Sequence, residues 1–367
     1  MKKLKSTQNT DSGSRLKDLR NAIDDIDNNI LDLINKRLHY AVEIGKIKKQ
    51  SGDRVFDEIR ENEIMRRLSS LNTGPIRNNV LLHIFKDIIS ESREIQQPLK
   101  VAFLGPQATF CHIAALNHFG CSVDFISQMN IRDIFGEVEK GACHYGVVPV
   151  ENSIEGSVNY TLDLFFESDL KICAETYQPI SHDLLAASGG LNDIKVIYSH
   201  PQALAQCRKW LQKTLPNIPC QECSSTSFAA HKASEEPGVG AIASSEAARI
   251  YNLQVIACNI QDYSHNVTRF LVIGKNDSPF SGNDKTSIMF ATAHAPGALY
   301  KALAPIAATQ INMVKLESRP TKHENWNYFF FVDIEGHRDD PNVHETLAKM
   351  KPLCLYIKSL GSYPKAQ

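Results

Sequence analysis

The feature that most constrains this chain is a long helical pattern without proline near its N-terminus. Apolar residues recur at the three- and four-residue spacing of one helix face, which predicts a continuous helix over residues 15–49. Two shorter helical patterns follow near 57–71 and 76–96. We therefore expect an all-α domain of three helices over residues 15–97, preceded by a flexible tail of residues 1–14.

The pattern of apolar and polar residues changes at Pro98. From there, short apolar runs alternate with helical stretches, which predicts an α/β domain over residues 98–275. The junctions "GPQATF" (105–110) and "SHPQAL" (199–204) each follow an apolar run, and α/β sheets usually bind ligands at such strand ends. Residues 284–362 then follow a strand-helix-strand-strand-helix-strand order, which predicts a ferredoxin-like module.

Composition excludes several classes of protein. A net charge of −1 over 367 residues argues against general nucleic-acid binding, and no apolar run approaches the ~18–20 residues of a membrane span. Nine irregularly spaced cysteines without a secretory signal predict reduced thiols in the cytoplasm. Cys220 and Cys223 lack the second cysteine pair that a zinc site requires. The glycines of "GVGAIA" (238–243) precede an apolar run, whereas the glycine loop of a dinucleotide-binding motif follows a strand. We expect no metal and no cofactor.

Polar residues lie at core-facing positions of the helical domain. Arg37 and Lys48 are eleven residues apart, so they differ by only ~20° around the helix and by ~16 Å along it. The apolar stripe of the third helix continues into Ser92 and Gln96. Buried polar groups cost free energy unless something satisfies them, so a small ligand is one explanation. A salt-bridged helix surface with a polar end is the other.

The stretches "LRNAIDDIDNNILDLINKRLHYAVEIGKIKK", "DEIRENEI" and "SESREIQQ" resemble the all-helical chorismate mutase family, over residues 15–97. The resemblance implies rearrangement of chorismate to prephenate, with eight polar side chains around the substrate. They are Arg20, Arg37 and Arg60 for the carboxylates, Lys48 and Gln96 for the ether oxygen, and Asp57, Glu61 and Ser92 for the remaining lining. Arg20 lies ~25 Å from Arg37 along the helix and ~100° around it. In the family this arginine comes from the partner subunit, so a homodimer or higher homo-oligomer is implied.

Six motifs of the α/β domain resemble prephenate dehydratases, across residues 99–274. They are "GPQATF", "VVPVENSIEGSV", "SHPQALAQC", "STSFAA", "GAIASSEAA" and "NVTRFLVIG". The resemblance implies two periplasmic-binding-like lobes with a cleft in which prephenate loses carbon dioxide and its ring hydroxyl. The matching residues are Asn152, Ser199, Gln206, Thr226, Thr268, Arg269 and Phe270, with Glu151 adjacent. A turn-and-cap role is the alternative explanation of Asn152.

Within this motif set the resemblance places Thr268 near the leaving hydroxyl. A neutral hydroxyl is a poor acid in water, so we expect it to act in a closed cleft. Arg269 either holds a substrate carboxylate or braces the loop, and the sequence leaves both open. Ala108 replaces a usual glycine, which predicts a stiffer loop, and Cys111 replaces a hydroxyl residue, which puts a hydroxyl contact there in question.

The segments "PGALYKAL" (296–303) and "INMVKLESRP" (311–320) resemble regulatory domains of the ACT type. The resemblance implies a phenylalanine site across a dimer interface, formed by Gly297, Ala298, Leu299, Asn312, Glu317, Ser318, Arg319 and Pro320. Gln310 replaces a usual glycine and Ile306 a common phenylalanine, which leaves the strength of inhibition open. A dimerisation module without a ligand is the alternative.

Together the three resemblances imply a bifunctional enzyme of phenylalanine biosynthesis, an isomerase and a lyase in one chain. Its ligands would be chorismate, prephenate and, as allosteric inhibitor, phenylalanine. Two other classes of protein are the alternatives. A non-catalytic sensor predicts binding without turnover, which the full sets of polar residues disfavour. Oxidative decarboxylation toward tyrosine requires a nicotinamide-binding strand, glycine loop and helix, and the sequence offers none.

Overall fold

The computed structural model describes residues 8–51, 56–320 and 328–366, with the backbone alone for residues 8–12. The chain divides into two compact units. One comprises Met1–Leu99 with Gly120–Val123, and the other comprises Lys100–Phe119 with Asp124–Gln367. The predicted tail of residues 1–14 falls partly outside the described residues, and its remainder belongs to the first helix.

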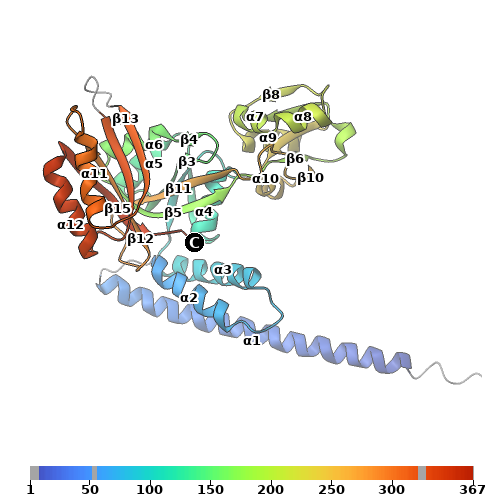
Figure 1. Ribbon diagram of the computed structural model, residues 1–367. Coiled ribbons are helices and arrows are strands. Elements are labelled where there is room, and N and C mark those ends of the chain that lie inside the picture. Colours follow the sequence, from blue (N-terminus) through green and yellow to red (C-terminus); the bar gives the residue numbers. More distant parts are fainter. Residues whose placement is uncertain (1–7, 52–55, 321–327, 367) are drawn as a thin grey trace, which may run out of the picture. The chain divides into compact units, whose positions relative to one another are not determined.

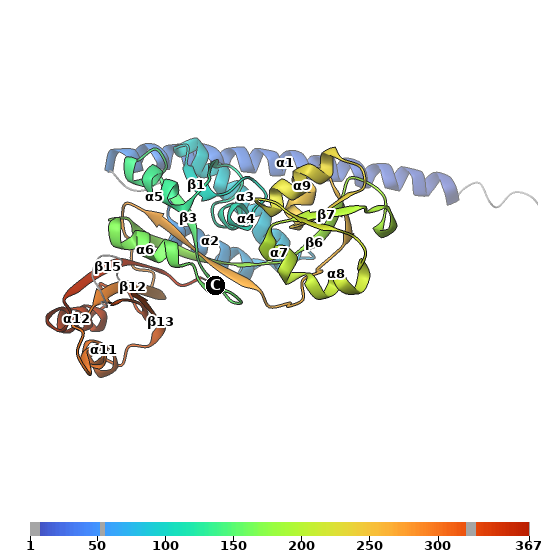
Figure 2. The same ribbon diagram turned by 90° about the horizontal axis from the view of Figure 1, so that it is seen from above.

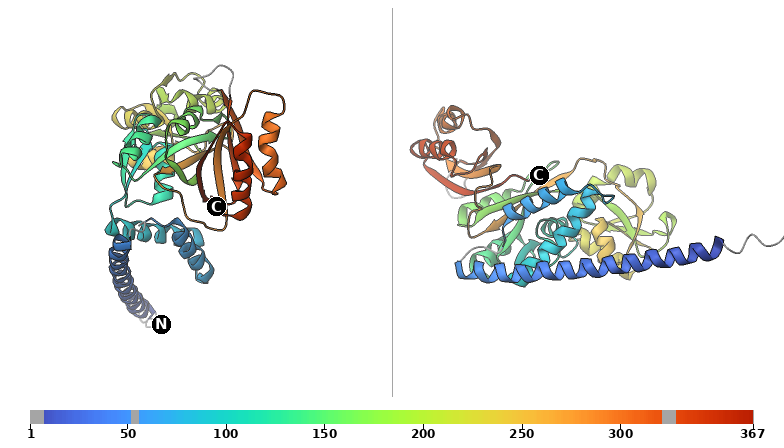
Figure 3. Two further views of the ribbon diagram at one scale, coloured as in Figure 1. Left: turned by 90° about the vertical axis from the view of Figure 1, so that its left-hand side faces the viewer. Right: turned by 90° about the horizontal axis from the view of Figure 1, so that it is seen from below.

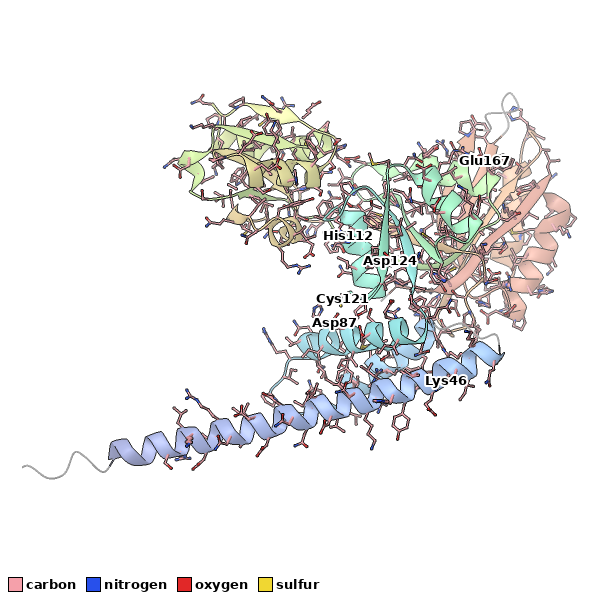
Figure 4. The ribbon with its side chains drawn as sticks, turned by 180° about the vertical axis from the view of Figure 1, so that it is seen from behind. Lys46, Asp87, His112, Cys121, Asp124 and Glu167 are labelled. Atoms are coloured by element: carbon pink, nitrogen blue, oxygen red, sulfur yellow. The ribbon has the colours of Figure 1, made fainter. Side chains whose placement is uncertain are left out.

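The first unit is all-helical, as predicted. Its helices are α1 (Gln8–Ser51), α2 (Glu58–Leu71) and α3 (Asn78–Gln96). Helices α2 and α3 lie along the C-terminal half of α1, whereas the N-terminal half extends past them (Figures 1 and 3). Helices α1 and α3 approach closely at Gly45, where an added Cβ would lie 2.7 Å from Cγ of Gln96. The loop Gly120–Val123 also belongs here, and the Cys121 thiol lies 3.3 Å from a carboxylate oxygen of Asp87 (Figure 4).

The first lobe of the second unit is a mixed sheet in the order β2-β1-β3-β11-β5, with β4 paired to β3. Its strands are β1 (Lys100–Leu104), β2 (Asp124–Gln128), β3 (Tyr145–Asn152), β4 (Gly156–Ser157), β5 (Lys171–Pro179) and β11 (Val267–Gly274). Its helices are α4 (Phe110–Phe119), α5 (Ile131–Lys140) and α6 (Asn159–Glu167). Strand β1 is parallel to β2 and β3, whereas β11 is antiparallel to both β3 and β5.

The second lobe is a five-stranded sheet in the order β10-β6-β9-β7-β8. Its strands are β6 (Asp183–Ala186), β7 (Val196–Ser199), β8 (Cys220–Glu222), β9 (Val239–Ala243) and β10 (Gln254–Ala257). Its helices are α7 (Pro201–Gln206), α8 (Arg208–Thr214), α9 (Thr226–Glu235) and α10 (Ser245–Ile250), with a 3-10 turn at Leu191–Asp193. The chain enters this lobe after β5 and returns through β11, so two segments join the lobes. The predicted two-lobed α/β architecture is confirmed.

The C-terminal domain has the predicted β-α-β-β-α-β order. Its elements are β12 (Asp284–Ala291), α11 (Ala298–Ala308), β13 (Met313–Pro320), β14 (Tyr328–Glu335), α12 (Pro341–Met350), a 3-10 turn at Lys351–Leu353, and β15 (Tyr356–Pro364). The antiparallel sheet has the order β13-β14-β12-β15, which leaves β13 at an edge. Helices α11 and α12 cover one face, and the opposite face meets the first lobe (Figure 2). There Met289 and Phe331 share a core with Ile172 and Leu271 of the lobe.

Two positions where the sequence departs from an expected glycine keep a left-handed backbone. The φ of Ala108 is 67° and that of Gln310 is 56°. An L-residue in this conformation is strained because its Cβ crowds the following carbonyl oxygen. Ala108 is buried among the alanines that line β9 and α9, which fits the prediction of a stiff loop. Among the helices of the described residues, none combines the length and apolarity that crossing a membrane requires.

Candidate functional site

A polar cluster lies where α1 meets α3 in the helical unit. The Arg37 guanidinium donates to the Ser92 hydroxyl and, at 3.4 Å, to the carbonyl of Ile88. The Ser92 hydroxyl donates to the same carbonyl at 2.6 Å, and the Gln96 amide donates to the carbonyl of Ser92 at 2.9 Å. Oε1 of Gln96 is buried and accepts no hydrogen bond from the described residues. The cluster therefore offers one cation and one acceptor to a small polar ligand.

Helix α2 adds Glu61 to this cluster. Burial raises the pKa of the Glu61 carboxyl, and the positive charges of Arg93, Lys86 and Lys48 act in the opposite direction. Nε of Arg93 lies 3.5 Å from Oε1 of Glu61, and Arg93 itself is 3% exposed. Because its pKa is raised, the Glu61 carboxyl is more easily protonated. In its neutral form it would not repel an anionic ligand bound in this cluster. Arg93 and Lys86 were not among the predicted site residues, although Arg93 directly follows Ser92.

Asp57 lies close enough to Glu61 for its negative charge to raise the pKa of that carboxyl, whereas Arg60 and Arg20 lie elsewhere in this single chain. Asp57 caps α2, since its carboxylate accepts from Arg60 N at 3.0 Å. The exposed Arg60 side chain pairs with Glu63 at 2.9 Å. Arg20 is exposed on the half of α1 that extends past α2 and α3. One chain thus brings together Arg37, Lys48, Glu61, Ser92 and Gln96, but not Arg20 or Arg60.

A cavity of about 850 Å³ lies between the two lobes of the second unit. The first lobe contributes the loop after β1, the end of β3, β4 and two residues of β11, Thr268 and Phe270. The second lobe contributes His182, α7 and the N-terminus of α9, including Thr226. Most of these segments lie at a strand end or a helix start, which is where the sequence predicts a ligand site.

Thr268 is held in this cavity by its cross-strand neighbour. Strands β3 and β11 place Asn152 opposite Thr268, and the Asn152 amide donates to the threonine hydroxyl oxygen at 2.8 Å. The same amide donates to the Asn266 side chain at 2.7 Å, while its carbonyl accepts from the backbone N–H of Ile154 and Glu155. Asn152 therefore shapes the turn and also orients Thr268, whose own hydroxyl hydrogen remains available for donation.

Amide side chains connect the two lobes across the cavity. Asn266 donates to Oε1 of Gln206 at 3.1 Å, and His182 Nε2 lies 2.9 Å from the same oxygen. Because that oxygen can only accept, the hydrogen on His182 is at Nε2. Burial lowers the pKa of His182, so the imidazole is neutral at pH 7. Gln206 completes the link through its amide, which donates to Glu155 at 3.2 Å.

The side chains of Ser199 and Cys111 both donate to backbone carbonyl groups. The fully buried Ser199 hydroxyl donates to the carbonyl of Ile242 at 2.6 Å, beneath the second lobe's surface. Cys111 lines the cavity, but its thiol donates to the carbonyl of Val147 at 3.3 Å. Burial raises the pKa of the Cys111 thiol to about 12, so it stays protonated. His182 lines the cavity, and Asn266 bonds to Asn152 and Gln206, which line it; neither residue was predicted from the sequence.

Arg269 points away from the cavity, because side chains alternate along β11. Its guanidinium donates to Glu175 on β5 at 2.9 Å, to Asp333 on β14 at 2.6 Å and to Tyr363 on β15 at 3.0 Å. Although burial lowers the pKa of Arg269, the negative charges around it raise the pKa overall. Glu151, opposite Arg269 in the ladder, pairs with Lys315 on β13 at 2.7 Å. Of the two roles left open for Arg269, the structure places it in a brace.

The predicted phenylalanine-site residues fall on both faces of the C-terminal sheet. Glu317 accepts from Ser157 at 2.9 Å, and Arg319 pairs with Asp163 at 3.1 Å, so both face the first lobe. Alternation places Ser318 on the face that carries α11. Gly297 begins α11 with a φ of 75° and has no atom within 4 Å of where a Cβ would lie. Ala298 and Leu299 form the first turn of that helix, and Pro320 ends β13.

Asn312 lies at the opposite end of β13 from Pro320. It lines a cavity of about 530 Å³ together with Gln310, Glu335 and Asp340. Within the described part of the chain, no three His, Cys, Asp or Glu side chains are grouped so as to hold a metal ion.

Comparisons with known proteins follow the same division of the chain. The family model for chorismate mutase type II matches residues 19–97, that for prephenate dehydratase matches residues 101–278, and that for the ACT domain matches residues 287–351. The bifunctional chorismate mutase/prephenate dehydratase of Aquifex aeolicus is 48% identical over 96% of this chain and 98% of its own length.

Two solved structures resemble the second unit. A prephenate dehydratase from Arthrobacter aurescens, in complex with L-Phe, is 34% identical with a TM-score of 0.67, covering 72% of this chain and 90% of that one. A structure described as GqqA, a novel type of quorum quenching acylase, is 27% identical with a TM-score of 0.66, covering 73% of this chain and 98% of that one.

Proposed function

Because this chain belongs to the bifunctional chorismate mutase/prephenate dehydratase family, we propose that its two polar sites divide the two reactions between them. The chain is an enzyme of phenylalanine biosynthesis that rearranges chorismate to prephenate and converts prephenate to phenylpyruvate under inhibition by phenylalanine. We place the domains at residues 15–97, 98–275 and 284–362. The observation that carries the site assignment is the Asn152–Thr268 hydrogen bond in the cavity between the lobes.

The helical unit holds the mutase site around Arg37. The rearrangement is intramolecular, so catalysis requires a compact substrate conformer and stabilisation of charge on the ether oxygen. Arg37 binds a carboxylate, Lys48 and Gln96 face the ether oxygen, and Ser92, Glu61 and Asp57 complete the lining. The hydrogen bond from Arg37 to Ser92 fixes the cation before substrate arrives. Such preorganisation supplies part of the roughly 8 kcal/mol or more by which enzymes lower barriers.

The mutase site is completed by a second copy of the chain. Apolar residues of α1 that would be core in a folded dimer are exposed here, for example Leu19 at 56%, Ile23 at 56% and Ile26 at 56%. A stripe of this length requires an apolar partner, and a second α1 supplies one of matching spacing. Pairing also brings Arg20 to the other copy's site, about 25 Å from its own Arg37. Arg60, which pairs with Glu63 in the single chain, exchanges that exposed partner for a substrate carboxylate.

The cavity between the lobes holds the dehydratase site. Prephenate loses its ring carboxylate as carbon dioxide, the electron pair enters the ring, and the ring hydroxyl leaves with a proton. Thr268 donates that proton or a hydrogen bond to the leaving oxygen, because its hydroxyl oxygen accepts from Asn152 while its hydrogen remains available to the substrate. Gln206 and Thr226 bind from the second lobe, and Phe270 packs against the ring. Ser199 supports β7 from beneath the site.

Phenylalanine binds the C-terminal domain where two copies meet. Asn312 directly precedes β13 and Pro320 ends it, about 26 Å away at strand rise, so a single chain cannot bring both to one amino acid. Antiparallel pairing of two β13 edges places the end of one strand beside the start of the other. Gly297, Ala298 and Leu299 supply a helix N-terminus for the carboxylate.

Glu317 and Arg319 stay engaged with the first lobe, while Ser318 contributes from the helix face. The resulting homodimer works in the cytoplasm, where its nine cysteines stay reduced.

A chorismate feed separates the two sites. The purified chain is supplied with chorismate, and prephenate and phenylpyruvate are followed with and without phenylalanine. The wild type should form phenylpyruvate, less so with phenylalanine. Thr268→Val should accumulate prephenate, and Arg37→Met should form neither product from chorismate yet convert added prephenate. Normal phenylpyruvate formation by Thr268→Val would refute the dehydratase site, and normal mutase turnover by Arg37→Met would refute the mutase site.

A further inference from the structure

Four charged side chains form a square between the first lobe and the C-terminal sheet. On the lobe, Arg269 of β11 lies opposite Glu151 of β3. On the sheet, Lys315 of β13 lies opposite Asp333 of β14. Across the interface, Arg269 pairs with Asp333 at 2.6 Å, and Lys315 pairs with Glu151 at 2.7 Å. Each charge therefore has an opposite charge both beside it in its own sheet and across from it.

The square lies directly behind the dehydratase pair. Thr268 and Asn152 are also opposite one another, one position along each strand, and they face the cavity. Because successive side chains of a strand point to opposite faces, one backbone step separates each cavity residue from a residue of the square. Any displacement of Glu151 or Arg269 along its strand axis thus displaces Asn152 or Thr268.

The two arms of the square differ in rigidity. Arg269 is locked in a closed ring: it donates to Tyr363 and Asp333, Ser287 donates to Asp333 at 2.6 Å, and Tyr363 lies 2.7 Å from Ser287. The Lys315–Glu151 arm is less enclosed, with the Glu151 side chain 39% exposed and the Lys315 side chain 13% exposed. Lys315 is on the edge strand β13. A displacement of that strand therefore changes the Lys315–Glu151 pair before it changes the Arg269–Asp333 pair.

The same strand reaches the cavity wall a second time. Glu317, two residues further along β13, accepts from the Ser157 hydroxyl at 2.9 Å, and Ser157 lines the cavity. Residues 151–157, which carry Asn152, are therefore held at both ends by β13.

We propose that Lys315 is a positioning residue of the dehydratase, which transmits the state of the regulatory sheet through Glu151 to Asn152 and Thr268. The inference rests on the proposed function, since it assigns a route between two of its sites. Phenylalanine bound at β13 acts on turnover by changing how Lys315 holds Glu151. Lys315 itself touches neither phenylalanine nor prephenate.

The test compares two lysines of the same interface in the full-length chain. Lys315→Met breaks the square, and Lys358→Met is the matched control, because Lys358 is 14% exposed and binds the carbonyls of Phe165 and Ser168 at the end of α6. For each variant we would measure kcat and KM for prephenate without and with saturating phenylalanine, phenylalanine binding by calorimetry, and mutase turnover. Lys315→Arg, which keeps the charge, serves as the rescue variant.

The inhibition factor, kcat without phenylalanine divided by kcat with it, is the decisive quantity. It should fall close to 1 in Lys315→Met while phenylalanine still binds and KM changes less than about twofold. It should keep the wild-type value in Lys358→Met and recover in Lys315→Arg. An unchanged factor in Lys315→Met, an equal loss in both methionine variants, or loss of phenylalanine binding overturns the route. A wild-type chain that makes no phenylpyruvate, or ignores phenylalanine, contradicts the proposed function instead.

Discussion

The ring around Arg269 predicts that this arginine is a major determinant of stability in the second unit. Arg269→Met keeps most of the side-chain volume but removes the cation and its hydrogen bonds. Glu175, which is 3% exposed, keeps Lys285 as a partner at 2.7 Å. Asp333, which is 7% exposed, keeps a hydrogen bond from Ser287 and loses its 2.6 Å ion pair.

The expected cost follows from that burial. Removing one member of a buried ion pair typically destabilises a protein by about 3–5 kcal/mol, because the remaining charge stays buried without compensation. Burial also raises the pKa of Tyr363 well above its usual value, so its neutral hydroxyl cannot replace the lost charge. For a domain of this size each kcal/mol corresponds to roughly 2–4 °C, so the transition temperature of the unit should fall by ~6–20 °C.

The assay is thermal unfolding of the full-length variants, with mutase turnover recorded before and after heating to identify the transition of the second unit. Lys285→Met is the matched control, because it removes another cation from Glu175 while leaving Arg269 in place. Its cost should be smaller than that of Arg269→Met, since Glu175 keeps its 2.8 Å ion pair with Arg269 and no buried charge loses its last cation. Arg269→Lys should fall between the two, because an ammonium cannot reach three acceptors at once.

A loss of less than about 1 kcal/mol in Arg269→Met would refute this reasoning, because it lies below the range for a broken buried pair. Equal losses in Arg269→Met and Lys285→Met would do the same, since they would show that Glu175 alone sets the effect. If mutase turnover is lost at the same lowered temperature as the transition, the two units do not unfold separately.

Three further predictions follow from single positions. Gln310→Gly should raise stability by about 0.5–1 kcal/mol in thermal unfolding by relieving the left-handed backbone, whereas Gln310→Ala should not. Gly45→Ala should lower mutase kcat at least tenfold with dehydratase turnover unchanged, because its Cβ would lie 2.7 Å from Cγ of Gln96. Burial lowers the pKa of His112 and His182, so the unfolded chain binds more protons below about pH 6.5, and stability should fall as pH drops from 7 to 5; replacing His182 with glutamine should lessen that slope.

Local pattern and family resemblance predicted the elements well, because their signals are local. The helical period of α1 and the alternation of apolar runs with helices after Pro98 depend only on near neighbours in sequence. The polar positions Ser92 and Gln96 also follow from periodicity, since they continue an apolar stripe, and Arg37 and Lys48 follow from their shared helix face. What the pattern left open was which polar residues meet in one chain, because that depends on how α2 and α3 pack against α1.

The residues that were missed show where sequence reasoning stops. Asn266 lies just before β11, two positions from Thr268, and it bonds to Asn152 and Gln206, which the sequence alone does not bring near it. His182 carried no signal in the sequence either. It lies between β5 and β6, and it meets Gln206, at the end of α7, only in the folded second lobe. Arg93 stands beside a predicted residue, but its burial against Glu61 depends on how α2 packs on α3.

Arg269 is the position where resemblance and geometry lead to different experiments. Alternation along β11 alone separates it from Thr268 and Phe270, yet the partner that occupies its face, Asp333, lies 64 residues away in sequence. A substrate contact would make Arg269→Lys raise KM for prephenate, whereas a brace would leave KM near the wild-type value and lower kcat and stability together. Loss of activity by itself therefore cannot assign Arg269 to the substrate. Its kcat and KM must be read separately, at a temperature where the variant is fully folded.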